Sequence, residues 1–436
     1  MRSTPAPVTM DEVRSFPRPG SGVSVSGGYL LEIRPFAAGM ALVLAMLAAS
    51  GTTPAHAASP HTNPLNLDPM VREAYQHFYL LDYPPCIALL EKVRQAHSSD
   101  PEAATLLLEA EVFAELYRQD LLDTTFYAND GFLTGKHPTP EDPQIRDRIF
   151  SLADEAVRLA EDRINRNPRD ADAFYARGWA RALRAAYVAM VERSFGAAFR
   201  MALQAHTDEV RVLQIDQDYT DAKLIVGTYQ YVIGALPFAF KIFFGFAGIT
   251  GSKPRGMEML QDANAHAPMV AVEAGTVITL FLRRESKYAE AIGVVRGLEA
   301  KYPRDFLFCL EEANLRKDAG EGMAAVDAYQ KLLSDAGKPG FFPSSHLELA
   351  YFGLGEALRG QRHFSDAANA YEQAAWTKNS GAELKRRSLV AGGKCRDLNG
   401  ERALAIRDYQ AAIATGSDTT QGEIARKLLN SPYREH

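Results

Sequence analysis

The chain has 436 residues, of which 47% are hydrophobic and 23% are charged, so it can bury a large core and is not composed like a disordered protein. The formal net charge is −6 at pH 7 and Lys and Arg form no long block, which excludes the basic surface expected of a nucleic-acid-binding protein. The three cysteines, Cys86, Cys309 and Cys395, are widely spaced and form no Cys-x-x-Cys pair. We interpret them as inert core thiols rather than redox or metal-binding groups.

The N-terminal residues carry the pattern of an export signal. Arg34 precedes the apolar run 36–49, and the Ala-His-Ala of 55–57 supplies the small residues that a signal peptidase accepts. The run is shorter than the roughly 20 apolar residues that span a bilayer, which favours a cleaved signal peptide over a membrane anchor. The sequence therefore predicts that 1–57 is a signal peptide with a long N-terminal extension, cleaved after Ala57, and that the mature protein is periplasmic or secreted.

The mature chain is predicted to begin with a flexible lead-in and to continue as helix pairs over 70–436. Residues 58–69 are rich in Pro, Asn and Ser, which is typical of a lead-in. From residue 70 onward, short amphipathic segments follow one another and prolines end many of them. The predicted pairs are 71–97, 102–166, 172–215, 221–268, 270–302, 306–336, the pair that contains 351–374, and 382–415, followed by a charged capping helix at 421–430.

One small pattern recurs in the second half of the chain. Its clearest copy has Gly355 on a first helix, where a small residue lets the second helix approach, and an apolar stripe on that second helix. The clearest copy reads Tyr351, Leu354, Gly355, Leu358, then Ala367, Tyr371, Ala374, and the stripe returns as Ala291, Val295, Leu298, as Ala325, Tyr329, Leu332 and as Ala405, Tyr409, Ala412. Ala291 and Ala325, which begin two of these stripes, are 34 residues apart. This is the period of a known helical repeat.

These residues resemble the tetratricopeptide repeat (TPR) family. Tyr351 stands where the family's aromatic residue stands, Leu354-Gly355 match its Leu-Gly, and the stripe that contains Tyr371 matches its second helix. The resemblance implies an all-α fold, a right-handed α-solenoid of TPR-like antiparallel helix pairs with a long concave binding surface. More loosely, the run 221–268 looks like the branch of the family that includes mitochondrial outer-membrane and inclusion-clearance proteins, and that likeness carries no catalytic residues.

Two insertions break the repeat and are longer than a turn between paired helices requires. The insertion 118–146 contains Phe126 and Tyr127, and the insertion 233–252 is rich in phenylalanine. Since each lies between the two helices of its pair, both are expected on one edge of the solenoid, as a lid or rim. The candidate residues for binding a partner or ligand are Phe238, Phe240, Lys241, Phe243, Phe244, Phe246, Phe126 and Tyr127.

Two interpretations of the phenylalanine-rich insertion stay open. It can fold as an extra short helix that fills the groove of its own solenoid, since buried aromatics are the usual outcome. It can instead form an apolar contact site for a hydrophobic ligand, a partner helix or the membrane surface. Pro237, Lys241 and several glycines interrupt it, which argues against a transmembrane span.

Strings that look like reactive motifs do not complete those motifs. The glycines of 245–251 precede Ser252-Lys253 in an order that a phosphate-binding loop does not use. The aspartates of 216–221 lack the glycine and the closing Glu of a calcium loop. There is no His-Glu-x-x-His and no Gly-x-Ser-x-Gly. We therefore predict no catalytic residues, no metal ligands and no cofactor.

The sequence thus predicts an exported, non-catalytic TPR scaffold that binds a protein or peptide in its concave groove. The alternative is a carrier or sensor of a small hydrophobic ligand or lipid held under the phenylalanine-rich insertion. A closed cavity lined by Phe238, Phe243 and Phe244 would favour the carrier, and an open groove would favour the scaffold. An enzyme remains a third possibility only if His, Asp or Glu side chains converge in one pocket.

Overall fold

The computed structural model describes residues 61–128, 141–236 and 249–435. The chain divides into two units, Met1–Ala58 and Ser59–His436, and every described residue belongs to the second. The predicted signal peptide lies outside the described residues, and so do the six candidate residues of the phenylalanine-rich insertion, which are Phe238, Phe240, Lys241, Phe243, Phe244 and Phe246. Within the described ranges the fold is all-α, with seventeen α-helices and three short 3₁₀ helices.

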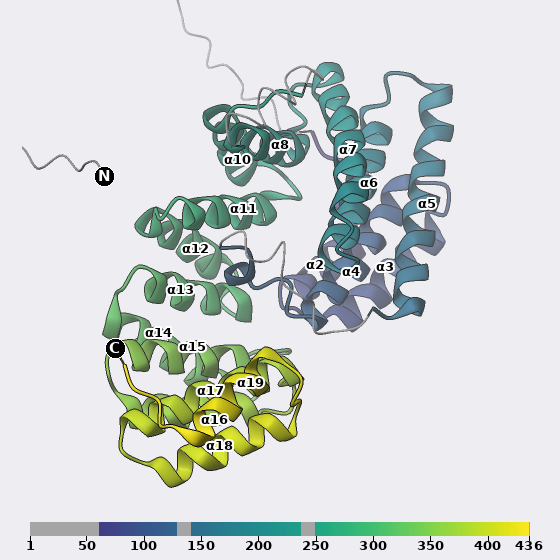
Figure 1. Cartoon of the computed structure of the whole chain (residues 1–436). Helices are drawn as coiled ribbons and strands as arrows, with labels where there is room; N and C mark the ends of the chain where they lie inside the picture. The colour runs from purple at the N-terminus through teal and green to yellow at the C-terminus, as the bar shows by residue number, and fades with distance from the viewer. Residues whose placement is uncertain (1–60, 129–140, 237–248, 436) are drawn as a thin grey trace, which may run out of the picture. The chain divides into compact units, whose positions relative to one another are not determined.

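The α-helices pack in consecutive pairs along the chain, and each pair packs against the next (Figure 1). The first four pairs are α2 (Pro69–Phe78) with α3 (Tyr83–Ala96), α4 (Pro101–Arg118) with α5 (Pro143–Arg166), α6 (Ala171–Met190) with α7 (Phe195–Ile215), and α8 (Lys223–Ala235) with α10 (Lys253–His266). The next four are α11 (Ala271–Arg284) with α12 (Tyr288–Lys301), α13 (Phe306–Asp318) with α14 (Gly322–Ala336), α15 (Leu347–Gly360) with α16 (Phe364–Trp376), and α17 (Ala382–Leu398) with α18 (Arg402–Ala414). The last helix is α19 (Thr420–Asn430), and the 3₁₀ helices are η1 (Pro64–Leu67), η2 (Thr124–Tyr127) and η4 (Thr220–Ala222). The predicted fold class is confirmed.

Close contact between a glycine and a tyrosine ring holds the helices of the last repeats together. A Cβ atom at Gly355 of α15 would lie 2.8 Å from Cδ1 of Tyr371 on α16, and one at Gly393 of α17 would lie 2.5 Å from Cε1 of Tyr409 on α18. Both tyrosines are fully buried. A larger residue at either glycine would push the two helices apart, so the small residue that the sequence pattern singled out is required by packing.

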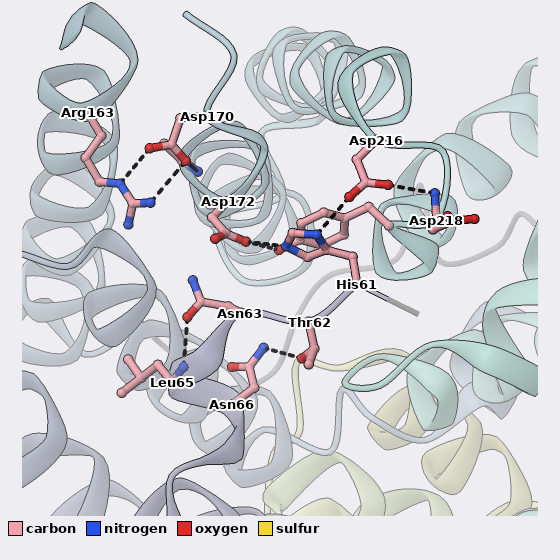
Figure 2. A network of polar contacts seen from close by, with 12 residues as sticks. His61, Thr62, Asn63, Leu65, Asn66, Arg163, Asp170, Asp172, Asp216 and Asp218 are labelled. Atoms are coloured by element: carbon pink, nitrogen blue, oxygen red, sulfur yellow. Dashed lines mark hydrogen bonds and ion pairs between the residues drawn. The ribbon is translucent and has the colours of Figure 1, made fainter. Parts of the chain in front are cut away.

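The first described residues are anchored on the repeats, although the composition of 58–69 predicts a flexible lead-in. His61 Nε2 lies 3.0 Å from Asp172 Oδ1, and His61 Nδ1 lies 2.8 Å from Asp216 Oδ2 (Figure 2). The backbone N–H of His61 donates to the carbonyl of Asp218 over 3.1 Å. These contacts fix the chain against the start of α6 and the end of α7, and η1 follows directly.

Residues 129–140 of the predicted insertion 118–146 and residues 237–248 of the predicted insertion 233–252 lie outside the described residues. The break between α4 and α5 is shorter than the predicted insertion 118–146, because α5 already begins at Pro143. Asp142 caps this helix, its Oδ1 accepting from the backbone N–H of Gln144 over 2.9 Å, and proline suits the first helical position. None of the helices in the described ranges has the length and apolarity that crossing a bilayer requires.

Candidate functional site: the inner face of the repeats

The first helices of the pairs contribute to one shared face, which we call the inner face. Side chains of α2, α4, α11 and α13 line one cavity on it, together with side chains of the second helices α3 and α12. Side chains of α4, α6, α8 and α11 line a second hollow beside it, together with the long helix α7. The inner face therefore runs across several repeats, and it is where a binding surface is expected in a stack of helix pairs.

Part of the inner face is covered by a segment of the same chain. Residues 117–127, the end of α4 together with η2, lie against α11, α13 and the start of α15, and we call them the docked segment. Thr124 Oγ1 donates to Glu311 Oε1 over 2.7 Å, and the side-chain amide of Asn314 donates to Asp123 Oδ1 over 3.4 Å. Asp123 Oδ1 also caps η2 by accepting from Thr125 N–H over 2.9 Å. The repeat surface thus recognises a polypeptide through specific polar side chains.

A buried ionic network fastens the docked segment. The side chain of Arg283 on α11 is 1% exposed, and its guanidinium lies 3.0 Å from Glu311 and 3.0 Å from Asp318. Arg283 Nη1 also contacts the hydroxyl of Thr124. Burial raises the pKa of Glu311 to about 7, and the attraction of Arg283 opposes but does not cancel this effect. The network joins two repeats and the docked segment in one desolvated cluster.

The structure places both described candidate residues, Phe126 and Tyr127, in η2 on the docked segment. Their rings pack edge to face with centroids 5.1 Å apart. The Tyr127 hydroxyl donates to the carbonyl of Leu121 over 3.0 Å, and the Tyr127 carbonyl accepts from Arg284 Nη1 over 2.9 Å. Phe126 packs against the main hydrophobic core. Both residues therefore help to hold the docked segment in place.

A partly enclosed cavity of about 190 Å³ remains beneath the docked segment. Its walls are mostly apolar, and they include Phe78, Phe113, Leu122, Val277, Leu298 and Phe308. Four acidic residues also line it, Asp123, Glu273, Asp305 and Glu311. Burial, reinforced by the charge of Glu109, raises the pKa of Glu273 to about 8, and burial raises the pKa of Asp305 to about 7.

An apolar groove of about 510 Å³ adjoins this cavity and shares Phe113, Glu273 and Val277 with it. Alanines on α6 and α7 make much of the lining, and Trp179 and Val232 stand beside them. Val232 is 45% exposed, although it is a large hydrophobic residue. The alanines are Ala182, Ala185, Ala186 and Ala189 on α6 and Ala198, Ala202 and Ala205 on α7. We call this surface the alanine groove.

The alanine groove was not among the sequence-based candidates. Its lining comes from five helices, and no short motif contains it. The one available signal is the spacing of 182, 185, 186 and 189 on α6, which places four small residues on one helix face. The same spacing is typical of an ordinary packed helix face, so it does not identify a site by itself.

The cysteines offer no reactive thiol. Cys86, Cys309 and Cys395 are buried, and burial raises the pKa of each thiol to about 12. Almost no thiolate is present at neutral pH under these conditions. The interpretation of the cysteines as core thiols agrees with their burial, and the absence of a redox or metal role stays a prediction.

Neither a protein-family model nor a curated protein sequence matches the chain. Solved structures of helical-repeat proteins resemble it at low identity. The Cut9–Hcn1 hetero-tetramer of the APC/C matches with a TM-score of 0.44 and 13% identity over 85% of this chain and 56% of that chain. A human IFIT1 dimer with PPP-AAAA matches with a TM-score of 0.39 and 11% identity over 82% of this chain and 81% of that chain. Yeast Tom70 matches with a TM-score of 0.33 and 14% identity over 84% of this chain and 82% of that chain.

The chain thus spans a little over half the length of the Cut9–Hcn1 chain that it matches. Structural similarity at TM-scores of 0.33 to 0.44 does not indicate a function. The TPR-like architecture rests on the consecutive helix pairs and on the glycine–tyrosine packing between them. The looser resemblance of 221–268 to one branch of the family stays a prediction.

Proposed function

We propose that the protein is a non-catalytic scaffold that binds an amphipathic helix of a protein partner in the alanine groove. The observation that carries this proposal is the lining of the groove, which combines two rows of alanines with the half-exposed Val232. Alanine rows let a helix backbone approach to the roughly 8–10 Å between axes of packed helices. The apolar lining suits the large side chains that an amphipathic helix presents at every third or fourth position.

Val232→Asp is expected to weaken partner binding by tenfold or more, because it places a charge in an apolar interface at a cost of roughly 1–3 kcal/mol. Since Val232 is 45% exposed, the free energy of unfolding should change by only about 0.5 kcal/mol. The measurement is quantitative mass spectrometry of proteins captured from the native cell by each variant, followed by titration of the recovered partner against each variant.

Met323→Asp is the matched control, because Met323 is 50% exposed on α14 and lines neither the cavity nor the alanine groove. A partner that binds the groove is retained by the control and lost by Val232→Asp. Equal retention by both variants would mean that the groove is not the binding surface.

A second candidate function is favoured by the partly enclosed cavity beside the groove. Its volume of about 190 Å³ is similar to the ~150 Å³ apolar cavity that binds benzene in an engineered protein. A carrier of a small apolar molecule would retain that molecule through purification, and native mass spectrometry of the protein from its own cell would show the added mass. A closed cavity lined by Phe238, Phe243 and Phe244 would favour the carrier, but these residues lie outside the described ranges, and the binding role of the phenylalanine-rich insertion stays a proposal.

Export is also proposed, on the basis of the apolar run 36–49 and the Ala-His-Ala of 55–57. The expected mature N-terminus is Ala58, in an extracytoplasmic fraction. N-terminal sequencing of the protein recovered from fractions of its native cell tests this, and an uncleaved chain in the cytoplasm would contradict it.

A further inference from the structure

Three potential metal ligands from distant parts of the chain meet where the docked segment reaches α15. Asp120 lies two residues after the end of α4, His346 is the residue before α15, and Glu348 lies in the first turn of α15. His346 Nδ1 lies 2.5 Å from Asp120 Oδ1 and 3.2 Å from Glu348 Oε1. One donor atom from each residue lies within 4.8 Å of the others. The two carboxylates therefore converge on the same ring nitrogen.

The cluster is largely removed from water and its polar atoms are not satisfied. The side chains of Glu348, His346 and Asp120 are 0%, 12% and 36% exposed. Both carboxylate oxygens of Glu348, Asp120 Oδ1 and His346 Nδ1 are buried. Apart from the contacts of His346 Nδ1 with Asp120 Oδ1 and Glu348 Oε1, these atoms have no hydrogen-bond partner within the described part of the chain. A buried carboxylate without a partner is costly, so the two carboxylates need a positive charge between them.

A proton on His346 can meet only part of this need. A single N–H at Nδ1 points at the two facing oxygens, Asp120 Oδ1 and Glu348 Oε1. Glu348 Oε2 would still have no donor. A bound cation would attract His346 Nδ1, Asp120 Oδ1 and both carboxylate oxygens of Glu348 at once.

We propose that Asp120, His346 and Glu348 bind a divalent transition-metal ion, with Zn²⁺ as the best match. One imidazole with two carboxylates is a ligand set that zinc accepts, and three protein ligands leave a fourth position for water. Zinc binds nitrogen and oxygen at ~2.0–2.2 Å, so Asp120 Oδ1 and His346 Nδ1, which lie 2.5 Å apart, would have to separate to admit the ion between them. The ion would fasten the docked segment to α15, and with it the N-terminal repeats to the C-terminal ones.

A second histidine, His61, provides a control for this cluster. His61 also lies between two aspartates, but it contacts Asp172 through Nε2 and Asp216 through Nδ1 (Figure 2). These two nitrogens point away from each other across the ring, so the carboxylates cannot share one ion with a common ring nitrogen. His61→Ala therefore removes a histidine with two acidic neighbours but should leave metal binding unchanged.

The test uses the full chain, stripped of metal with EDTA and titrated with ZnCl₂ by calorimetry near neutral pH. We expect one saturable zinc per chain and a higher Tm with zinc present. Glu348→Gln and His346→Ala should each weaken zinc binding by more than about tenfold, since even residues that only support a metal ligand have effects of 10–100-fold. Co²⁺ is the second probe, and its visible absorption should be lost in His346→Ala but kept in His61→Ala.

The proposal is overturned if the folded wild-type chain shows no one-to-one binding, or if Glu348→Gln binds zinc as tightly as the wild type. Either result would mean that Asp120, His346 and Glu348 do not together bind zinc. If circular dichroism shows that His346→Ala is unfolded, Glu348→Gln and Asp120→Asn still decide the question, because both keep the size of the side chain and remove only its charge.

Discussion

Arg283→Met is expected to destabilise the protein by about 3–5 kcal/mol, the usual loss when one partner of a buried ion pair is removed. The Arg283 side chain is 1% exposed and lies 3.0 Å from both Glu311 and Asp318. Methionine fills similar space but leaves Glu311 buried without its cation. Urea denaturation, followed by circular dichroism, measures the change in the free energy of unfolding.

The same substitution should also loosen the docked segment, because Thr124 is held by both Arg283 and Glu311. Limited proteolysis should then cut within 119–128 more quickly in the variant than in the wild type. A faster cut without a change in global stability would mean that the network fastens this segment alone.

Arg296→Met is the control for a generic loss of charge. Arg296 is 58% exposed and lies 2.8 Å from Glu312, and an exposed pair of this kind contributes roughly 0–1 kcal/mol. The double variant Arg283→Met with Glu311→Met should recover part of the lost stability, since it removes both buried charges. A cost below 1 kcal/mol for Arg283→Met would contradict the role assigned to the network.

The helix pairs could be predicted from the sequence because the information for them is local. Gly355 and Tyr371 are 16 positions apart in the chain, and the same relation returns as Gly393 and Tyr409. A periodic pattern of this kind reports how neighbouring helices pack. The anchoring of His61 could not be read in this way, because its partners lie more than one hundred residues further along the chain.

The docked segment and the converging ligands escaped prediction for the same physical reason. Thr124 and Glu311 are 187 residues apart, and Asp120 and His346 are further apart still. Contacts between residues so far apart in the sequence depend on how the whole stack brings its first helices together. No periodic sequence pattern indicates them. The predicted insertion 118–146 did point to the right region, because the docked segment begins where the repeat pattern breaks.

Buried acidic groups concentrate on the inner face, and they make its stability depend on pH. Glu273 is 9% exposed, and its Oε1 accepts a hydrogen bond from the Tyr79 hydroxyl over 3.2 Å. Burial and the nearby Glu109 outweigh this hydrogen bond and raise the pKa of Glu273 to about 8 from an ordinary value of 4.5. The folded protein therefore holds a proton that the unfolded chain releases between these two pH values.

The free energy of unfolding is accordingly expected to fall as the pH rises from about 5 to 8, by up to about 1.4 kcal/mol per pH unit for one such group. In this window the folded state binds more protons than the unfolded state, so the stability contributed by protonated Glu273 is complete below pH 4.5 and is lost as the pH rises through 8. Glu273→Gln keeps the shape and cannot ionise. It should match the wild type near pH 5, exceed it near pH 8, and have a flatter profile in urea denaturation across this range.

Glu285→Gln is the control of opposite sign. Hydrogen bonds from Lys253, Tyr231 and Lys287 lower the pKa of Glu285 to about 2, so its contribution is present above pH 4.5 and is lost only as the pH falls toward 2. This variant should lose stability at neutral pH and leave the slope between pH 5 and 8 unchanged. If Glu273→Gln shows the same slope as the wild type, the pH dependence arises from other buried carboxyls, and Glu273 is already ionised in the folded protein.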